Sequence, residues 1–109
     1  MKISTGIARL TRDPEIKYVS NNLAVVNFGI AKNKKYKNKD ETIFLDVSIF
    51  GKQAETIHSN FRKGNRIILE GKLKMDTWDQ NGSMRTKHSL LATEFEFVDY
   101  KDSDMIEMA

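Results

Sequence analysis

The chain has 109 residues, with 39% hydrophobic and 30% charged, which is the size and composition of one globular domain. It has no cysteine, which excludes a disulfide framework, a zinc–cysteine cluster and a cysteine nucleophile. No apolar run approaches the roughly 20 residues of a membrane-spanning helix, and the N-terminus lacks the apolar part of a secretory signal. We therefore expect no membrane partner and a cytoplasmic location.

Charge is unevenly distributed along the chain. The whole sequence carries 18 basic and 15 acidic residues, a net charge of +3, but residues 99–109 hold four acids against one lysine. Residues 1–98 therefore carry a net charge of +6. A basic body of this kind favours an anionic partner. We expect one domain at 1–98 and a short acidic C-terminal tail at 99–109.

The first half of the chain follows the two-residue alternation of β-strands. It predicts three strand regions, at 2–10, 24–31 and 43–50. Between the first two lie a break at 11–15, a short segment at 16–19 and a turn at 20–22, and a lysine-rich loop or hairpin tip follows at 32–41. The strand IFLDVSIF at 43–50 carries four aliphatic side chains on one face, so we expect that face to be buried. Its other face carries Phe44, Asp46, Ser48 and Phe50.

The period then becomes helical. Apolar positions at Ala54, Ile57 and Phe61 predict a helix over 52–63 that ends before Gly64, with His58 as a half-buried packing residue. Strand periodicity returns at 66–78 and 85–98, and the Asn-Gly pair between them predicts a hairpin.

This order of elements predicts an all-β protein. It is the order of an OB-fold, a five-stranded Greek-key barrel with one helix between its strands 3 and 4. An SH3-like barrel is the competing architecture, but it usually lacks a full helix at this point. We expect no enzyme, because neither histidine has a matched nucleophile or base, and no cofactor or metal, because no ligand cluster or phosphate-binding glycine loop is present.

Aromatic residues outside the predicted core are the most informative feature. Phe44 and Phe50 alternate away from the aliphatic face, and Trp78 shares its face with Lys72 and Lys74. Such a face is either covered by a loop or a second subunit, or it stacks the bases of a single-stranded nucleic acid. Tyr36 lies in a run of lysines, which is either a solvated hairpin tip or a surface that binds phosphates and a base.

Six short motifs carry a family resemblance. They are LTRDPE at 10–15, AVVNF at 24–28, IFGK at 49–52, FRKG at 61–64, LEG at 69–71 and WDQNG at 78–82. In this order and spacing, from about residue 2 to residue 98, the chain resembles bacterial-type single-stranded DNA-binding proteins.

The resemblance implies an OB-fold that commonly assembles as a homotetramer, with a dimer as the alternative, and wraps single-stranded DNA. It implies sequence-independent binding and protection of that DNA in replication, recombination and repair, at the nucleoid. The implied base-stacking residues are Tyr36, Phe44, Phe50 and Trp78, of which the first two are tryptophan in many members. The implied phosphate contacts are Lys32, Lys34, Lys35, Lys52, Arg62, Lys72, Lys74 and Arg85.

The C-terminus departs from the family pattern. Family members usually continue into a long tail whose acidic tip ends in an aromatic residue and recruits replication and repair proteins, and this sequence lacks that tip. The sequence is a naturally short relative, a shortened form, or a chain whose acidic end serves its own partner. Our hypothesis is that the acidic residues at 99–107 compete weakly with DNA for the basic groove.

Two other binding functions remain open from the residues alone. One is an RNA-binding OB module, although such modules usually cluster their aromatic residues within one strand. The other is a protein-interaction module or primosome accessory, in which the exposed aromatic residues are buried in an interface and binding to nucleic acid is weak.

Overall fold

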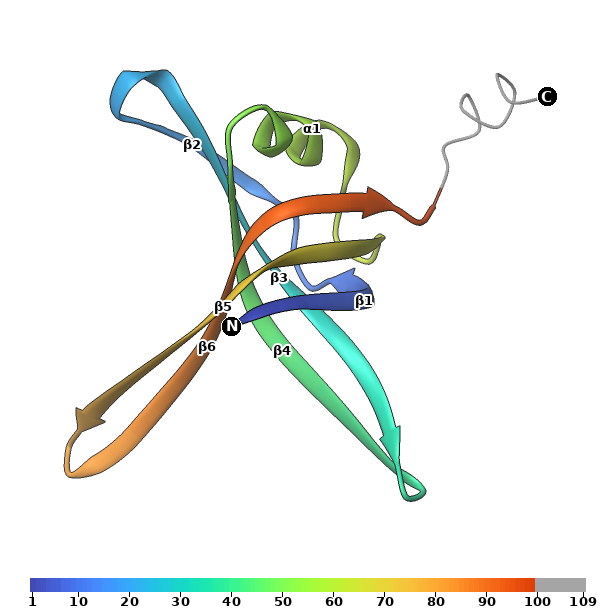
Figure 1. Ribbon diagram of the computed structural model, residues 1–109, viewed down its shortest axis with the longest axis vertical. Coiled ribbons are helices and arrows are strands. Elements are labelled where there is room, and N and C mark those ends of the chain that lie inside the picture. Colours follow the sequence, from blue (N-terminus) through green and yellow to red (C-terminus); the bar gives the residue numbers. More distant parts are fainter. Residues whose placement is uncertain (100–109) are drawn as a thin grey trace.

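The computed structural model describes residues 1–99, apart from the side chain of residue 36. Figure 1 shows the elements in chain order. They are β1 (Lys2–Leu10), β2 (Glu15–Val19), a 3₁₀ turn (Ser20–Asn22), β3 (Leu23–Tyr36), β4 (Lys39–Phe50), α1 (Lys52–Asn60), β5 (Arg66–Gln80) and β6 (Ser83–Phe97).

Strand pairing closes five of the strands into a ring. The order is β1, β5, β6, β4 and β3, and β3 returns to β1 where Arg9 and Leu10 face Ala31 and Ile30. Every pairing in the ring is antiparallel except that of β4 with β6. This is the topology of an OB-fold, and α1 lies between the third and fourth ring strands as predicted. The sixth strand, β2, pairs only with β3 among the described residues.

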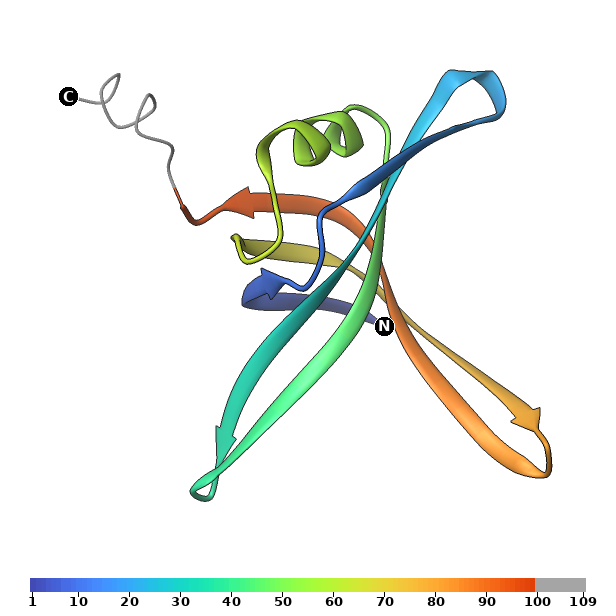
Figure 2. The ribbon, with the colours of Figure 1, turned by 180° about the vertical axis from the view of Figure 1, so that it is seen from behind.

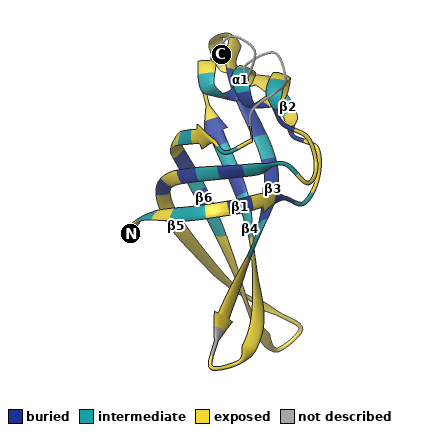
Figure 3. Ribbon diagram, turned by 90° about the vertical axis from the view of Figure 1, so that its right-hand side faces the viewer, coloured by how far each residue is buried: buried dark blue, intermediate teal, exposed yellow. Residues whose placement is uncertain are grey.

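The core fills the ring and continues under α1. Figure 3 shows the buried residues gathered in the barrel and at the helix. Fully enclosed side chains come from several strands and from the helix: Val26, Phe28, Val47, Ile49, Ile57, Ile67, Leu69 and Leu90. Ala54 and Phe61 are also buried, so α1 closes one end of the barrel with its apolar face.

Two hairpins extend as arms from the other end of the barrel (Figures 1 and 2). One consists of β3 and β4 and turns at Lys37 and Asn38, whose φ angles are 48° and 65°. The other consists of β5 and β6 and turns at Asn81 and Gly82, with φ angles of 54° and 83°. Two positive φ angles in a two-residue loop are typical of a type I′ turn, which confirms the hairpin predicted from the Asn-Gly pair.

The structure corrects four local predictions. Residues 32–41 are mostly paired strand rather than loop, because the β3–β4 ladder continues to Tyr36 and Lys39. Ile43 was expected in the core but is 47% exposed, because β4 enters the barrel only at Leu45 and Val47. The helix ends at Asn60, since Phe61 is already extended, and His58 is exposed rather than half-buried.

Gly71 provides a test of the β5–β6 packing. A Cβ atom at this position would collide with the carbonyl oxygen of Leu91 and lie 2.6 Å from the Cα atom of Ala92. Because both obstacles are backbone, we predict that Gly71→Ala lowers the free energy of unfolding by about 1–3 kcal/mol. Urea unfolding measures this, with the exposed Ser83→Ala as control. Equal midpoints for the two variants would show that the strands separate at no cost.

Candidate functional site

The outward face of the barrel is defined by strand register. Directly paired residues of neighbouring strands project to the same side of a sheet. Asp46 and Ser48 of β4 pair with Ser89 and Leu91 of β6, and these pair in turn with Lys74 and Lys72 of β5. Phe44, Phe50, Trp78 and Arg85 share this alternation. We define the outer face by the following residues: Phe44, Asp46, Ser48, Phe50, Lys72, Lys74, Asp76, Trp78, Arg85, Lys87 and Ser89.

Three of the four predicted stacking residues are exposed on the outer face. Phe44 is 67% exposed, Phe50 44% and Trp78 43%. Among the described side chains, ring-to-ring contacts involve only Phe61, Phe95 and Phe97, near α1. Each of the three outer-face aromatics thus keeps a large part of its side chain in contact with solvent in the single chain. Tyr36 ends β3, but its side chain is outside the described part, so its stacking role stays a prediction.

The predicted phosphate contacts divide into two groups. Lys72, Lys74 and Arg85 lie on the outer face, and Lys35 has the same alternation on β3, opposite Asp40. The others lie elsewhere. Lys32 and Lys34 alternate to the opposite side of the β3–β4 arm, Lys52 begins α1, and Arg62 follows it.

Hydrogen bonds hold two of these other cations, Lys32 and Arg62, away from the outer face. The Lys32 Nζ donates to the carbonyl oxygen of Ile7 at 3.3 Å, which directs this ammonium toward β1. The Arg62 guanidinium donates to the carbonyl oxygens of His58 at 2.8 Å and Phe61 at 2.7 Å, so it covers the end of the helix. Neither cation points to the outer face in this structure.

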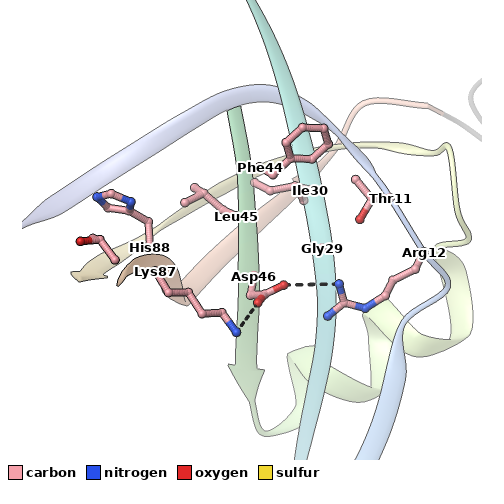
Figure 4. A pocket seen from close by; sticks show the side chains of 10 residues that line it. Thr11, Arg12, Gly29, Ile30, Phe44, Leu45, Asp46, Lys87 and His88 are labelled. Carbon is pink, nitrogen blue, oxygen red and sulfur yellow. Dashed lines mark hydrogen bonds and ion pairs between the residues drawn. The ribbon is translucent and has the colours of Figure 1, made fainter. Parts of the chain in front are cut away.

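An open hollow of about 380 Å³ lies where the two arms separate. Its lining includes Thr11, Arg12, Gly29, Phe44, Asp46 and Lys87. Figure 4 shows Asp46 between two cations that come from different sides. The Asp46 Oδ1 lies 3.4 Å from the Arg12 Nη1, and the Asp46 Oδ2 lies 2.7 Å from the Lys87 Nζ. We call Arg12, Asp46 and Lys87 the ionic bridge.

Gly29 makes the ionic bridge possible. Arg12 belongs to the turn after β1, and its side chain must cross β3 to reach Asp46 on β4 (Figure 4). A Cβ atom at residue 29 would lie 2.6 Å from the Arg12 Nη1 and would also collide with the Thr11 hydroxyl. The backbone N–H of Thr11 donates to the Gly29 carbonyl at 2.9 Å and holds the turn against the strand.

The two cations favour the ionised form of Asp46. A hydrogen bond from Lys87, together with its charge and that of Arg12, lowers the pKa of Asp46 below its ordinary value, although partial burial opposes the shift. The same effect occurs at the end of β6, where hydrogen bonds from Arg66 lower the pKa of Asp99. There Arg66 donates from Nη2 at 2.6 Å and from Nε at 2.9 Å. Asp99, the first residue of the predicted tail, is thus attached to the barrel.

Sequence reasoning did not identify Arg12 or Lys87 as site residues, and it treated Asp46 only as a polar neighbour of the phenylalanines. Lys87 could have been found, since it follows Arg85 by two residues in a strand and so shares its face. Arg12 could not, because only the folded turn brings it across β3.

Within residues 1–99, no group of three or more acidic or histidine side chains is arranged to hold a metal ion. In the same part of the chain, the single α-helix is too short and polar to cross a membrane.

Comparisons with known proteins agree with this geometry. The profile of the "Single-strand binding protein family" matches residues 3–98. A protein named single-stranded DNA-binding protein from Helicobacter hepaticus is 37% identical over 89% of this chain and 61% of its own length. One of the same name from Wolinella succinogenes is 38% identical over 87% of this chain and 62% of its own. The chain thus spans about three fifths of these relatives.

The fold has a solved counterpart. The crystal structure of a small single-stranded DNA-binding protein from Streptomyces coelicolor covers 90% of this chain and 94% of its own, with a TM-score of 0.80 and 22% identity. At this identity the likeness establishes the fold alone.

The ionic bridge predicts a pH dependence. Because the pKa of Asp46 is lowered in the folded chain, the bridge stabilises the fold above the ordinary aspartate pKa of 3.8 and loses this effect as pH falls through the lowered value. We predict that Asp46→Asn reduces the free energy of unfolding at pH 7 by at most about 1 kcal/mol, since the groups are half exposed. Thermal unfolding at pH 7 and at pH about 2 checks this. A difference that persists undiminished in acid would contradict it.

Proposed function

We propose a function from one established point: this chain belongs to the single-strand binding protein family. The function is sequence-independent binding and protection of single-stranded DNA. The observation that carries it is the outer face itself, where exposed Phe44, Phe50 and Trp78 share one side of the sheet with Lys72, Lys74 and Arg85. Family membership makes the chain a binding protein and not an enzyme.

The chemistry of a single strand fits this face. Unpaired bases expose π-faces that a duplex hides, and aromatic rings stack on them whatever the base. Lys72, Lys74 and Arg85 lie beside the rings and neutralise the phosphates between successive bases. Phe44 and Phe50 lie on β4 and Trp78 lies near the end of β5, so a strand that contacts all three rings crosses from β4 to the β5–β6 arm.

The proposal includes a cellular setting. The chain acts in the cytoplasm at the nucleoid, where single-stranded DNA arises in replication, recombination and repair. Its acidic residues beyond Asp99 lie outside the described residues, and the hypothesis that they compete with DNA stays a prediction. The strongest competing function is a protein-interaction module, because exposed Phe44 and Ile43 would also suit a protein interface.

We further propose that the chain forms a homo-oligomer, a tetramer in preference to a dimer. Support comes from β1, which pairs with β3 only at Arg9 and Leu10 and so leaves most of one edge open in the single chain. Ile7 on this strand is 49% exposed. An open edge with an exposed aliphatic side chain is suited to pairing with a second copy about a two-fold axis.

Fluorescence of Trp78, the only tryptophan, tests DNA binding directly. We predict strong quenching by oligo-dT, little quenching by a duplex of equal length, and an affinity that falls linearly with salt on logarithmic axes. Tighter binding of oligo-rU than of oligo-dT would favour RNA as the ligand. Absence of quenching by either single strand would leave the protein-interaction function.

Neighbouring residues on β4 separate stacking from packing. Stacking on an aromatic side chain in single-strand binding proteins is worth about 1–3 kcal/mol per base, so we predict that Phe44→Ala weakens oligo-dT binding by that amount. Ile43→Ala is the matched control, because Ile43 is also exposed but projects to the opposite side of the arm. Both variants are first sized by sedimentation. A change of oligomeric state with unaltered affinity in Phe44→Ala would assign the ring to an interface instead.

A further inference from the structure

A carboxylate occupies the middle of the outer face. Asp46 lies between Phe44 and Phe50 on β4, on the side proposed to receive a polyanion. An isolated negative charge here would repel phosphate groups, so its presence requires a physical explanation.

The contacts of Asp46 provide that explanation. Its two carboxylate oxygens accept from different cations, Oδ1 from Arg12 and Oδ2 from Lys87. A phosphate group would offer two oxygens of its own to the same two donors, because guanidinium and ammonium groups bind either anion. Asp46 therefore occupies both cations in the way that a bound phosphate would.

The ionic bridge is accessible to solvent. The exposed fractions of the side chains are 48% for Arg12, 41% for Asp46 and 56% for Lys87. An incoming strand can therefore reach both cations. The site is also built into the fold, since Gly29 makes room for Arg12 to cross β3, and the pairing of β4 with β6 brings Lys87 near Asp46.

We propose that Asp46 is an internal competitor for DNA phosphate. In the free protein its carboxylate occupies Arg12 and Lys87, and a backbone phosphate of the bound strand takes its place on the two cations. The inference rests on the proposed binding of single-stranded DNA and assigns to that face a phosphate site formed by Arg12 and Lys87. It also assigns Asp46 the role of limiting the affinity for single-stranded DNA.

Removing the carboxylate tests this role. We predict that Asp46→Asn raises affinity for oligo-dT about tenfold at low salt, because two cations become available without competition. The slope of log affinity against log salt should steepen by about 0.7, the contribution of the one phosphate that the two cations then hold without competition. Asp46→Ser removes the same charge without introducing an amide and should give the same result.

Two further variants distinguish competition from a general change of charge. Asp40→Asn removes a carboxylate from the same strand and the same alternation but outside the ionic bridge, and we expect a smaller gain in affinity and an unchanged slope. Adding Lys87→Gln to Asp46→Asn should return the slope by about 0.7 toward that of the original protein. Thermal unfolding at pH 7 establishes that each variant is folded.

The outcomes separate the two proposals. Tighter binding with a steeper slope in Asp46→Asn, absent in Asp40→Asn, supports competition. If the original protein binds oligo-dT and Asp46→Asn binds equally or more weakly, the carboxylate orients the cations instead, and the competition proposal is overturned while single-strand binding stands. If the original protein binds no single strand, both proposals fall.

Discussion

The short parallel pairing of β4 with β6 is the constraint on which the rest of the structure depends. It joins Asp46, Val47 and Ser48 to Ser89, Leu90 and Leu91, and without it the ring of five strands would be open. Because it extends over only three residue pairs, the β3–β4 and β5–β6 hairpins separate beyond it and project as two arms. The same contact thus closes the core through Val47 and Leu90 and opens the hollow at Asp46.

This arrangement lets one strand serve stability and binding at once. Along β4, Val47 and Ile49 are buried in the barrel, while Phe44 and Phe50 project to the opposite side and remain exposed. Phe44 is 67% exposed, so its replacement removes little buried surface and alters binding without a large loss of stability. The pleat of the strand therefore separates two sets of substitutions that lie next to each other in sequence.

Positive charge is divided between the outer face and the rest of the molecule. Lys72, Lys74 and Arg85 accompany the aromatic rings, whereas Lys32 contacts β1 and Arg62 covers the end of α1. Net charge attracts a polyanion over a distance, but only the cations beside the rings can hold phosphates between stacked bases.

The sequence by itself determined the order of the five ring strands along the chain, the place of the helix between them and the Asn-Gly hairpin. It also determined the outward direction of Phe44 and Phe50, because all of these features follow from local periodicity and turn chemistry. It could not determine how far the arms extend, since Ile43 has the pattern of a core residue and is exposed only because β4 leaves the barrel. Nor could it bring Arg12, Gly29, Asp46 and Lys87 together. Those residues come from four parts of the chain, and only the register of the closed ring decides which side chains meet.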